Sequence, residues 1–292
     1  MATDPAAPTD PTAPAAAPGK LLITDTAFFR LTEREFGMPG LVAIESIGPF
    51  VEHAVVGPFL TIHDSTLAPG LGIGHHPHRG NERLFYILRG EIRHDDALNG
   101  ITGVMEEGDL ARLTEGRRGM IHREWNGRDD ITTHAFILVY TPDAEPPLEH
   151  ASFAALRAAD APRVAEAPGV ETIELIGGRS AFRASSSAIT RLVDSTLADG
   201  ATLDAVIPAG EALILYPLGG VLHLDAGAAG EAELRGSSAL HPEGPGAVAI
   251  LFAAESAVTV SLRASGGPAR VLRTGFVRIS PDVVRQEPRD RA

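Results

Sequence analysis

Short strand-like segments, separated by glycine and charged turns, run through most of this chain. In the first half they are FLTIHD (59–64), RLFYILRGEIRH (83–94), LARLT (110–114) and HAFILVY (134–140). In the second half they are ITRLVDSTL (189–197), ALILYPLGGVLHL (212–224), AVAILFA (247–253) and AVTVSLRA (257–264). The 292 residues include 31 Gly and 22 Pro, and few stretches favour helix. Many short strands joined by tight turns predict an all-β fold.

The chain is long enough for two β-barrels, each with its own core. Residues 1–19 are rich in Ala and Pro and are predicted to be a disordered extension. Residues 20–145 are predicted to form the first barrel, and residues 146–171 a linker with one short helical pattern at 151–159. Residues 172–292 are predicted to form the second barrel. It is expected to end in a short helix that begins at Ser280-Pro281 and runs to about Gln286.

The two halves show a weak internal repeat. The segment YILRGEI (86–92) aligns with YPLGGVL (216–222) at an offset of 130 residues. At that offset His76, His78 and Glu82 fall on valine, proline and alanine, at positions 206, 208 and 212. If the repeat is real, the second half kept the scaffold and lost these polar side chains. One metal site per chain, in the first barrel, is the prediction.

Two short runs place metal-ligand side chains at alternate positions of strand-like segments. His76 and His78 form one pair, and His122 and Glu124 form the other. Alternate residues of a strand point to the same face of a sheet, so the members of each pair share a face. If the two strands face each other inside a barrel, three imidazoles and one carboxylate converge. That set suits a divalent first-row transition metal and predicts Fe(II) with open coordination positions, or another divalent transition metal in its place.

Other polar residues have competing interpretations. Glu82 follows the first histidine pair and could act as a ligand in competition with Glu124, or support the ligands through hydrogen bonds. The run His94-Asp95-Asp96 resembles a metal cluster, but it precedes an Asn-Gly turn, and we interpret it as a solvated turn. In the second half, the pair at 223 and 225 has ligand spacing but stands alone, and we do not assign it to a metal.

Charge and composition exclude several classes of function. The formal net charge is -13 and the basic residues, almost all Arg, are scattered, which argues against direct binding of nucleic acid. Any role in transcription would need a protein partner. The chain has no Cys, so His and carboxylates are left to hold a metal. Residues 1–19 do not resemble a secretory signal, and no run approaches the roughly 18 apolar residues of a membrane span. A soluble, cytoplasmic protein is the prediction.

The first half also resembles a known pair of motifs. It reads Gly70-x5-His76-x-His78-x3-Glu82-x7-Gly90, then Gly108-x5-Thr114-x-Gly116 and Gly119-x2-His122-x3-Asn126. This pattern is similar to that of the cupin superfamily, small β-barrels that hold a metal inside. The runs HPHRG (76–80), LRGEIRHDD (88–96) and EEGDLARLTEGRRG (106–119), with His122-x-Glu124, resemble the pirin family more closely. Asn81 departs from the family pattern, where an aromatic residue is usual, which bears on the substrate or partner.

Pirins are bicupins whose N-terminal barrel binds iron through His-x-His and His-x-Glu. The resemblance therefore implies a bicupin with His76, His78, His122 and Glu124 as the iron ligands. Because family members include quercetin 2,3-dioxygenases, it also implies a dioxygenase that acts on a flavonol or another small enolisable aromatic compound, with Glu124 as the base. The family also includes an iron-dependent nuclear co-regulator, so the alternative is a regulatory module that binds a protein partner without catalysis. A third interpretation is a non-redox isomerase or hydrolase that uses another divalent ion.

Overall fold

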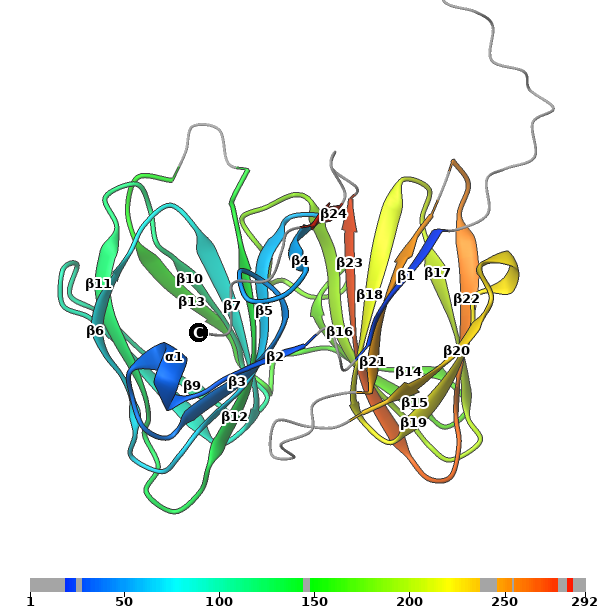
Figure 1. Ribbon diagram of the computed structural model, residues 1–292, viewed down its shortest axis with the longest axis horizontal. Coiled ribbons are helices and arrows are strands. Elements are labelled where there is room, and N and C mark those ends of the chain that lie inside the picture. Colours follow the sequence, from blue (N-terminus) through cyan, green and yellow to red (C-terminus); the bar gives the residue numbers. More distant parts are fainter. Residues whose placement is uncertain are drawn as a thin grey trace, which may run out of the picture.

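The computed structural model describes residues 19–24, 28–143, 148–236, 246–253 and 255–277, and the backbone of 283–285. These residues form two β-barrels that lie side by side (Figure 1). The predicted all-β, two-barrel architecture is therefore confirmed. Of the predicted disordered extension, residues 1–18 lie outside the described residues. The α-helix α1 (Glu33–Phe36) has four residues, and no helix in the described parts of the chain is long and apolar enough to cross a membrane.

Two sheets build the first barrel. The larger one contains β2 (Phe29–Leu31), β3 (Leu41–Ile47), β4 (His53–Val56), β5 (Phe59–Leu67), β7 (Glu82–Arg89), β10 (Leu110–Thr114), β12 (Thr133–Tyr140), β13 (Ser152–Leu156) and β24 (Val283–Arg285). Its main path runs β13-β10-β7-β12-β5-β3-β2, and β4 pairs with both β5 and β24. The smaller sheet contains β6 (Gly72–His78), β8 (Glu91–Asp96), β9 (Ile101–Glu106) and β11 (Met120–Asn126). Its order is β6-β11-β8-β9.

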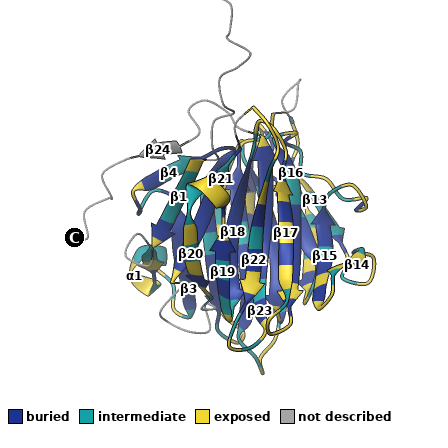
Figure 2. Cartoon of the chain, turned by 90° about the vertical axis from the view of Figure 1, so that its right-hand side faces the viewer, coloured by how far each residue is buried: buried dark blue, intermediate teal, exposed yellow. Residues whose placement is uncertain are grey.

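The second barrel repeats this plan. Its larger sheet contains β1 (Gly19–Thr24), β14 (Arg163–Ala167), β15 (Val170–Ile176), β16 (Ile189–Leu197), β18 (Glu211–Gly219), β21 (Ala247–Phe252) and β23 (Ala269–Val277), in the order β1-β21-β18-β23-β16-β15-β14. Its smaller sheet contains β17 (Thr202–Ile207), β19 (Val221–Asp225), β20 (Glu231–Arg235) and β22 (Val258–Ala264), in the order β17-β22-β19-β20, and the 3-10 turn Gly227–Ala229 connects β19 to β20. Buried and exposed residues alternate along β17, as Figure 2 shows for this outer sheet. One face of the small sheet therefore lines the barrel and the other faces solvent.

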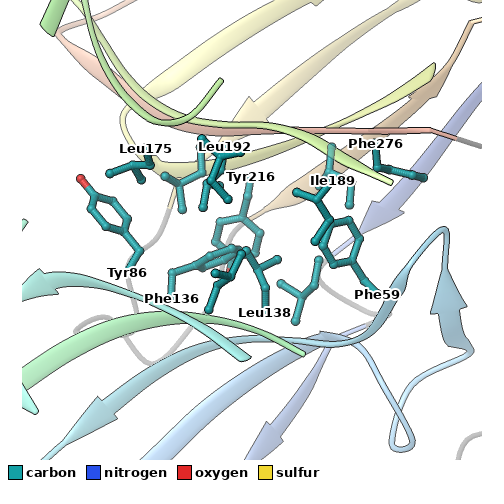
Figure 3. Close-up of a cluster of buried hydrophobic side chains, with 14 of the residues drawn as sticks. Phe59, Tyr86, Phe136, Leu138, Leu175, Ile189, Leu192, Tyr216 and Phe276 are labelled. Atoms are coloured by element: carbon teal, nitrogen blue, oxygen red, sulfur yellow. The ribbon is translucent and has the colours of Figure 1, made fainter. Parts of the chain in front are cut away.

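The two large sheets pack against each other through one hydrophobic core that both barrels share. Phe59, Tyr86 and Phe136 come from the first barrel, and Tyr216 and Phe276 come from the second (Figure 3). Strand β7 is nearly continuous in apolar residues because its two faces are both covered. One face lines the first barrel and the other packs on the second barrel. The site described below therefore rests on a strand that is fixed from two sides.

Two reciprocal hydrogen bonds join the barrels and follow the predicted repeat. The Tyr86 hydroxyl donates to Asp194 at 2.6 Å, and the Tyr216 hydroxyl donates to Asp64 at 3.2 Å. Position 216 is 86 plus 130, and position 194 is 64 plus 130, so the same offset relates both tyrosines and both aspartates. The second barrel lines the equivalent interior with aliphatic side chains, among them Leu203 of β17.

Strand pairing crosses the domain boundaries expected from the sequence. Strand β1 pairs with β21 of the second barrel, with Leu21 opposite Ile250, and β24 pairs with β4 of the first barrel. In Figure 1 the dark-blue β1 accordingly lies among the yellow and orange strands. Within the expected linker, β13 pairs with β10 of the first barrel and β14 pairs with β15 of the second. Each end of the chain thus completes a sheet in the opposite barrel.

Both predicted helices differ from the structure. The segment 151–159 contains strand β13, so the helix expected there is wrong. Its alanines favour helix, but hydrogen bonding to the free edge of β10 outweighs that local preference. At the C-terminus, the described residues 283–285 form strand β24 rather than part of a helix, because they extend the exposed edge of β4. The expected N-cap Ser280 and Pro281 lie outside the described residues.

Candidate metal centre

Two neighbouring strands of the small sheet bring the predicted histidines together. Strands β6 and β11 pair antiparallel, with His76 opposite His122 and His78 opposite Met120. The ring centroid of His122 lies 4.5 Å from that of His76 and 4.9 Å from that of His78, and the centroids of His76 and His78 are 4.7 Å apart. One ligand nitrogen from each of the three rings lies within 4.8 Å of the others. The expected convergence of three imidazoles is therefore present.

A glycine allows the two strands to approach closely. A methyl group built on Gly72 would overlap the carbonyl oxygen of Glu124 and the Cα atom of Trp125, which lies opposite Gly72 in the pairing. The pairing also shifts register between His122 and Glu124. This irregularity changes how the two side chains of β11 are presented to the barrel.

The hydrogen bonds leave suitable nitrogens free for a metal. The Nδ1 atom of His76 lies 2.7 Å from the carbonyl oxygen of Gly74, so Nδ1 is the protonated nitrogen and Nε2 has a free lone pair. The Nε2 atom of His122 is buried and has no hydrogen-bond partner among the described residues. A buried polar atom without a partner is costly, and a bound cation would satisfy it. The residues present therefore fit a divalent metal.

The fourth predicted ligand lies on the other side of His122. Glu124 Oε1 is 3.5 Å from Nδ1 of His122, and Nδ1 of His94 is 3.2 Å from the same atom. His94, His122 and Glu124 form a second group whose ligand atoms lie within 4.8 Å of one another. Glu124 Oε1 is also buried without a partner in the described part of the chain. The structure thus groups three of the four predicted ligands and places Glu124 beside His94.

His94 is a residue that the sequence interpretation missed. It was assigned to a solvated turn, but both His94 and Asp96 are buried on the inner face of β8. Asp96 does serve the turn, since it accepts hydrogen bonds from the backbone of Leu98 and Asn99. The overlooked signal is the spacing of two from the buried Ile92, which puts His94 on the same face.

Two further charged residues border the imidazoles and were not singled out from the sequence. Arg83 Nη2 lies 2.8 Å from Nδ1 and 3.1 Å from Nε2 of His78. Arg83 Nε donates to Glu115 Oε1 at 3.0 Å, and the other oxygen of Glu115 accepts from the backbone N–H of Asn81 at 2.9 Å. Glu115 is fully buried, and its two bonds fix the position of the guanidinium.

Burial controls the protonation of the site. It lowers the pKa of His122 to about 2 and that of His78 to about 3, and the positive charge of Arg83 acts in the same direction. It also lowers the pKa of His94 to about 4, and of His76 below its usual range. Burial raises the pKa of Glu124 to about 7. At neutral pH the imidazoles are therefore neutral and can donate a lone pair to a cation.

The other residues considered from the sequence lie elsewhere. Glu82 is fully buried toward the second barrel, where it accepts hydrogen bonds from the Tyr140 hydroxyl and, at 2.8 Å, from the backbone N–H of Ser185. This carboxylate therefore links the barrels rather than the imidazoles. His223 lies 2.8 Å from the Ser265 hydroxyl on the second barrel.

The first barrel matches a family of known proteins. Residues 32–138 match the family model described as Pirin. Pirin-like protein 2 from Arabidopsis thaliana is 32% identical over 161 residues, which cover 54% of this chain and 48% of that protein. The chain thus spans about half the length of this curated relative.

Solved structures share the two-barrel fold. A quercetin 2,3-dioxygenase from Acinetobacter baumannii is 20% identical with a TM-score of 0.67, over 90% of this chain and 88% of that one. The bacterial pirin YhhW from Escherichia coli, in complex with nickel(II), is 17% identical with a TM-score of 0.57, over 86% of this chain and all of that one (100%). At these identities the likeness shows the fold alone.

Proposed function

Because the chain belongs to the pirin family over residues 32–138, we propose that its first barrel binds a divalent transition metal through His76, His78 and His122. The observation that carries this proposal is the convergence of three neutral imidazoles around the unpartnered, buried Nε2 of His122. Glu124 is the proposed fourth ligand, since its buried Oε1 also has no partner among the described residues. The nickel(II) in the related YhhW structure is consistent with a divalent ion.

The proposed activity is an iron-dependent dioxygenase acting on a flavonol such as quercetin, or on another small enolisable aromatic compound. Bound iron(II) would supply Lewis acidity toward an enolate oxygen and a redox partner for dioxygen. Glu124 is the proposed base. Burial raises its pKa to about 7, so its carboxylate can accept a hydroxyl proton near neutral pH. His76 and His78 are partly exposed whereas His122 is buried, so a substrate would reach the site from the side of His76 and His78.

Oxygen uptake tests this activity. Purified protein loaded anaerobically with iron(II) should consume oxygen when quercetin is added, and should release an equal amount of carbon monoxide. Metal content is measured first, so that failed loading is not mistaken for inactivity. If the iron-loaded protein binds quercetin but consumes no oxygen, the dioxygenase proposal is wrong, and a metal-dependent module that binds a protein partner is the function to test next.

The ligand assignment has its own test. His78→Ala should abolish metal loading and leave the fold intact, because the side chain is partly exposed and removing it creates little buried cavity. His75→Ala is the matched control, since His75 precedes His76 on the same strand and is exposed outside both ligand groups. Metal analysis after dialysis and far-UV circular dichroism provide the measurements. Full metal content in His78→Ala would remove His78 from the ligand set.

A further inference from the structure

Arg83 and Glu115 form a fixed ion pair on the accessible side of the three imidazoles. The Arg83 side chain, on β7, is 18% exposed, whereas the Glu115 side chain is fully buried. Both oxygens of Glu115 are engaged, one by Arg83 and the other by the backbone of Asn81. The guanidinium therefore cannot move away from the histidines without breaking a buried, charge-assisted hydrogen bond.

A fixed cation is an unfavourable neighbour for a second cation. The Nη2 atom of Arg83 lies within 3.1 Å of both ring nitrogens of His78, one of the proposed ligands. A metal held by His78 would therefore lie near a positive charge. Such an arrangement becomes favourable when an anion lies against both charges, since each then has an opposite charge beside it.

The charges of the site also leave room for one negative group. A divalent metal and Arg83 contribute three positive charges, and Glu115 and Glu124 contribute two negative charges. The remaining single positive charge lies in a largely buried setting, where an uncompensated charge is costly. A monoanion would make the site neutral.

We propose that Arg83, held by Glu115, forms an anion subsite beside the metal, and that the ligand of this barrel is a small organic anion. Its ionised oxygen, from an enolate or a carboxylate, accepts a hydrogen bond from Arg83 while the molecule contacts the metal. This proposal rests on the metal site proposed above, but it does not depend on dioxygenase activity. It makes Arg83 a residue that selects for charge in the substrate.

Binding to nickel(II)-loaded protein tests the subsite without oxygen chemistry. Quercetin serves as the enolate probe, because its absorption changes when it ionises, and salicylate serves as the carboxylate probe, followed by calorimetry. Arg83→Met should weaken binding of an anion by about tenfold or more, as expected for a lost charge-assisted hydrogen bond. Arg83→Lys should lie between, since it keeps the charge but loses the planar guanidinium.

Two further variants guard the interpretation. The double variant Arg83→Met/Glu115→Gln removes both charges, leaves no unpaired buried carboxylate, and should lose anion binding as Arg83→Met does. Arg79→Met removes a nearby exposed arginine, and binding should stay within about twofold of wild type because exposed charges are screened. Metal content and thermal unfolding are measured for every variant.

The outcomes separate this proposal from the dioxygenase proposal. Arg83-dependent binding of quercetin, salicylate or both supports the subsite, and which of them binds identifies the source of the anionic oxygen. Such binding without oxygen uptake in the iron form would overturn the dioxygenase proposal alone. Binding of neither probe to metal-loaded wild type, or equal binding by Arg83→Met, would overturn the subsite.

Discussion

At the scale of single residues, His122 is the centre of the site because its two ring nitrogens face different groups. Nδ1 lies beside His94 and Glu124, while the unpartnered Nε2 is the atom available to a metal with His76 and His78. A metal on Nε2 requires a proton on Nδ1, and that proton needs an acceptor. His94 Nδ1, at 3.2 Å, can accept it. His94 would then fix the tautomer and orientation of a ligand that it does not replace.

His94→Leu should therefore weaken metal binding by about 10–100-fold, the usual effect of losing the partner of a ligating histidine. The fold should persist, because leucine can still pack against Phe153, which stacks on His94 with ring centroids 6.0 Å apart. Competition with a chromophoric chelator measures the affinity. His75→Leu is the control and should bind metal as wild type does. Unchanged affinity in His94→Leu would show that His122 is oriented by other contacts.

Glu124 should make the stability of the metal-free protein depend on pH. Burial raises its pKa from 4.5 to about 7, so the folded state holds a proton that the unfolded state releases. This contribution is present below about pH 4.5 and is lost as the pH rises through 7. Glu124→Gln should therefore gain up to about 3 kcal/mol over wild type at pH 8 and little at pH 5. Urea unfolding with a chelator present measures both, and an equal difference at the two pH values would contradict the prediction.

The sequence identified the three histidines because alternation along a strand is a local property. It did not identify Arg83 and Glu115, since charged residues in a strand are normally assigned to the solvent face. Their inward positions follow from their bond to each other, which joins residues 32 positions apart in the chain. His94 was missed for a similar reason, because the two aspartates after it made the run look solvated.

At the scale of elements, the close approach of β6 and β11 holds the ligand strands in place. Gly72→Ala should push them apart, because the added methyl would overlap backbone of β11. We expect a loss of about 1–3 kcal/mol in the free energy of unfolding, together with weaker metal binding. Gly74→Ala, on the same strand, is the matched control, since the nearest atom to its added methyl is 3.8 Å away in Met38. Equal behaviour of the two variants in chemical denaturation would refute the steric argument.

Element type was predictable where it is encoded locally and was wrong where distant pairing decides it. The apolar run of β7 predicts a buried strand by itself. The segment Ser152–Leu156 contains two alanines and suggests helix, yet every residue of it pairs with a residue of β10. An available strand edge outweighs propensities that differ by less than about 1 kcal/mol per residue.

At the scale of the whole molecule, the two barrels are interlocked by their termini. Removing residues 1–24 should destabilise the second barrel, because it deletes β1, exposes the edge of β21 and removes the buried Ile23. Ile23 alone accounts for about 1.5–3 kcal/mol, and the exposed apolar edge should promote aggregation. Removing residues 1–18 leaves β1 intact and serves as the control. Thermal unfolding and light scattering measure the two effects, and identical curves for both truncations would contradict this role of β1.

The repeat was visible in the sequence, whereas this exchange of strands was not. A constant offset of 130 residues relates local patterns that can be compared directly, and the reciprocal pairs Tyr86–Asp194 and Tyr216–Asp64 agree with it. The pairing of β1 with β21 leaves no such trace, since any apolar six-residue segment could serve as the edge strand.

The position of β1 also has a consequence for biosynthesis. Leu21 leaves the ribosome early, but its partner Ile250 is made only near the end of translation. During that interval the nascent chain carries an unpaired apolar strand that a chaperone must shield or that must find a temporary partner. Completion of the second barrel is therefore a late, post-translational event, and slow or premature termination of synthesis would yield chains that cannot close it.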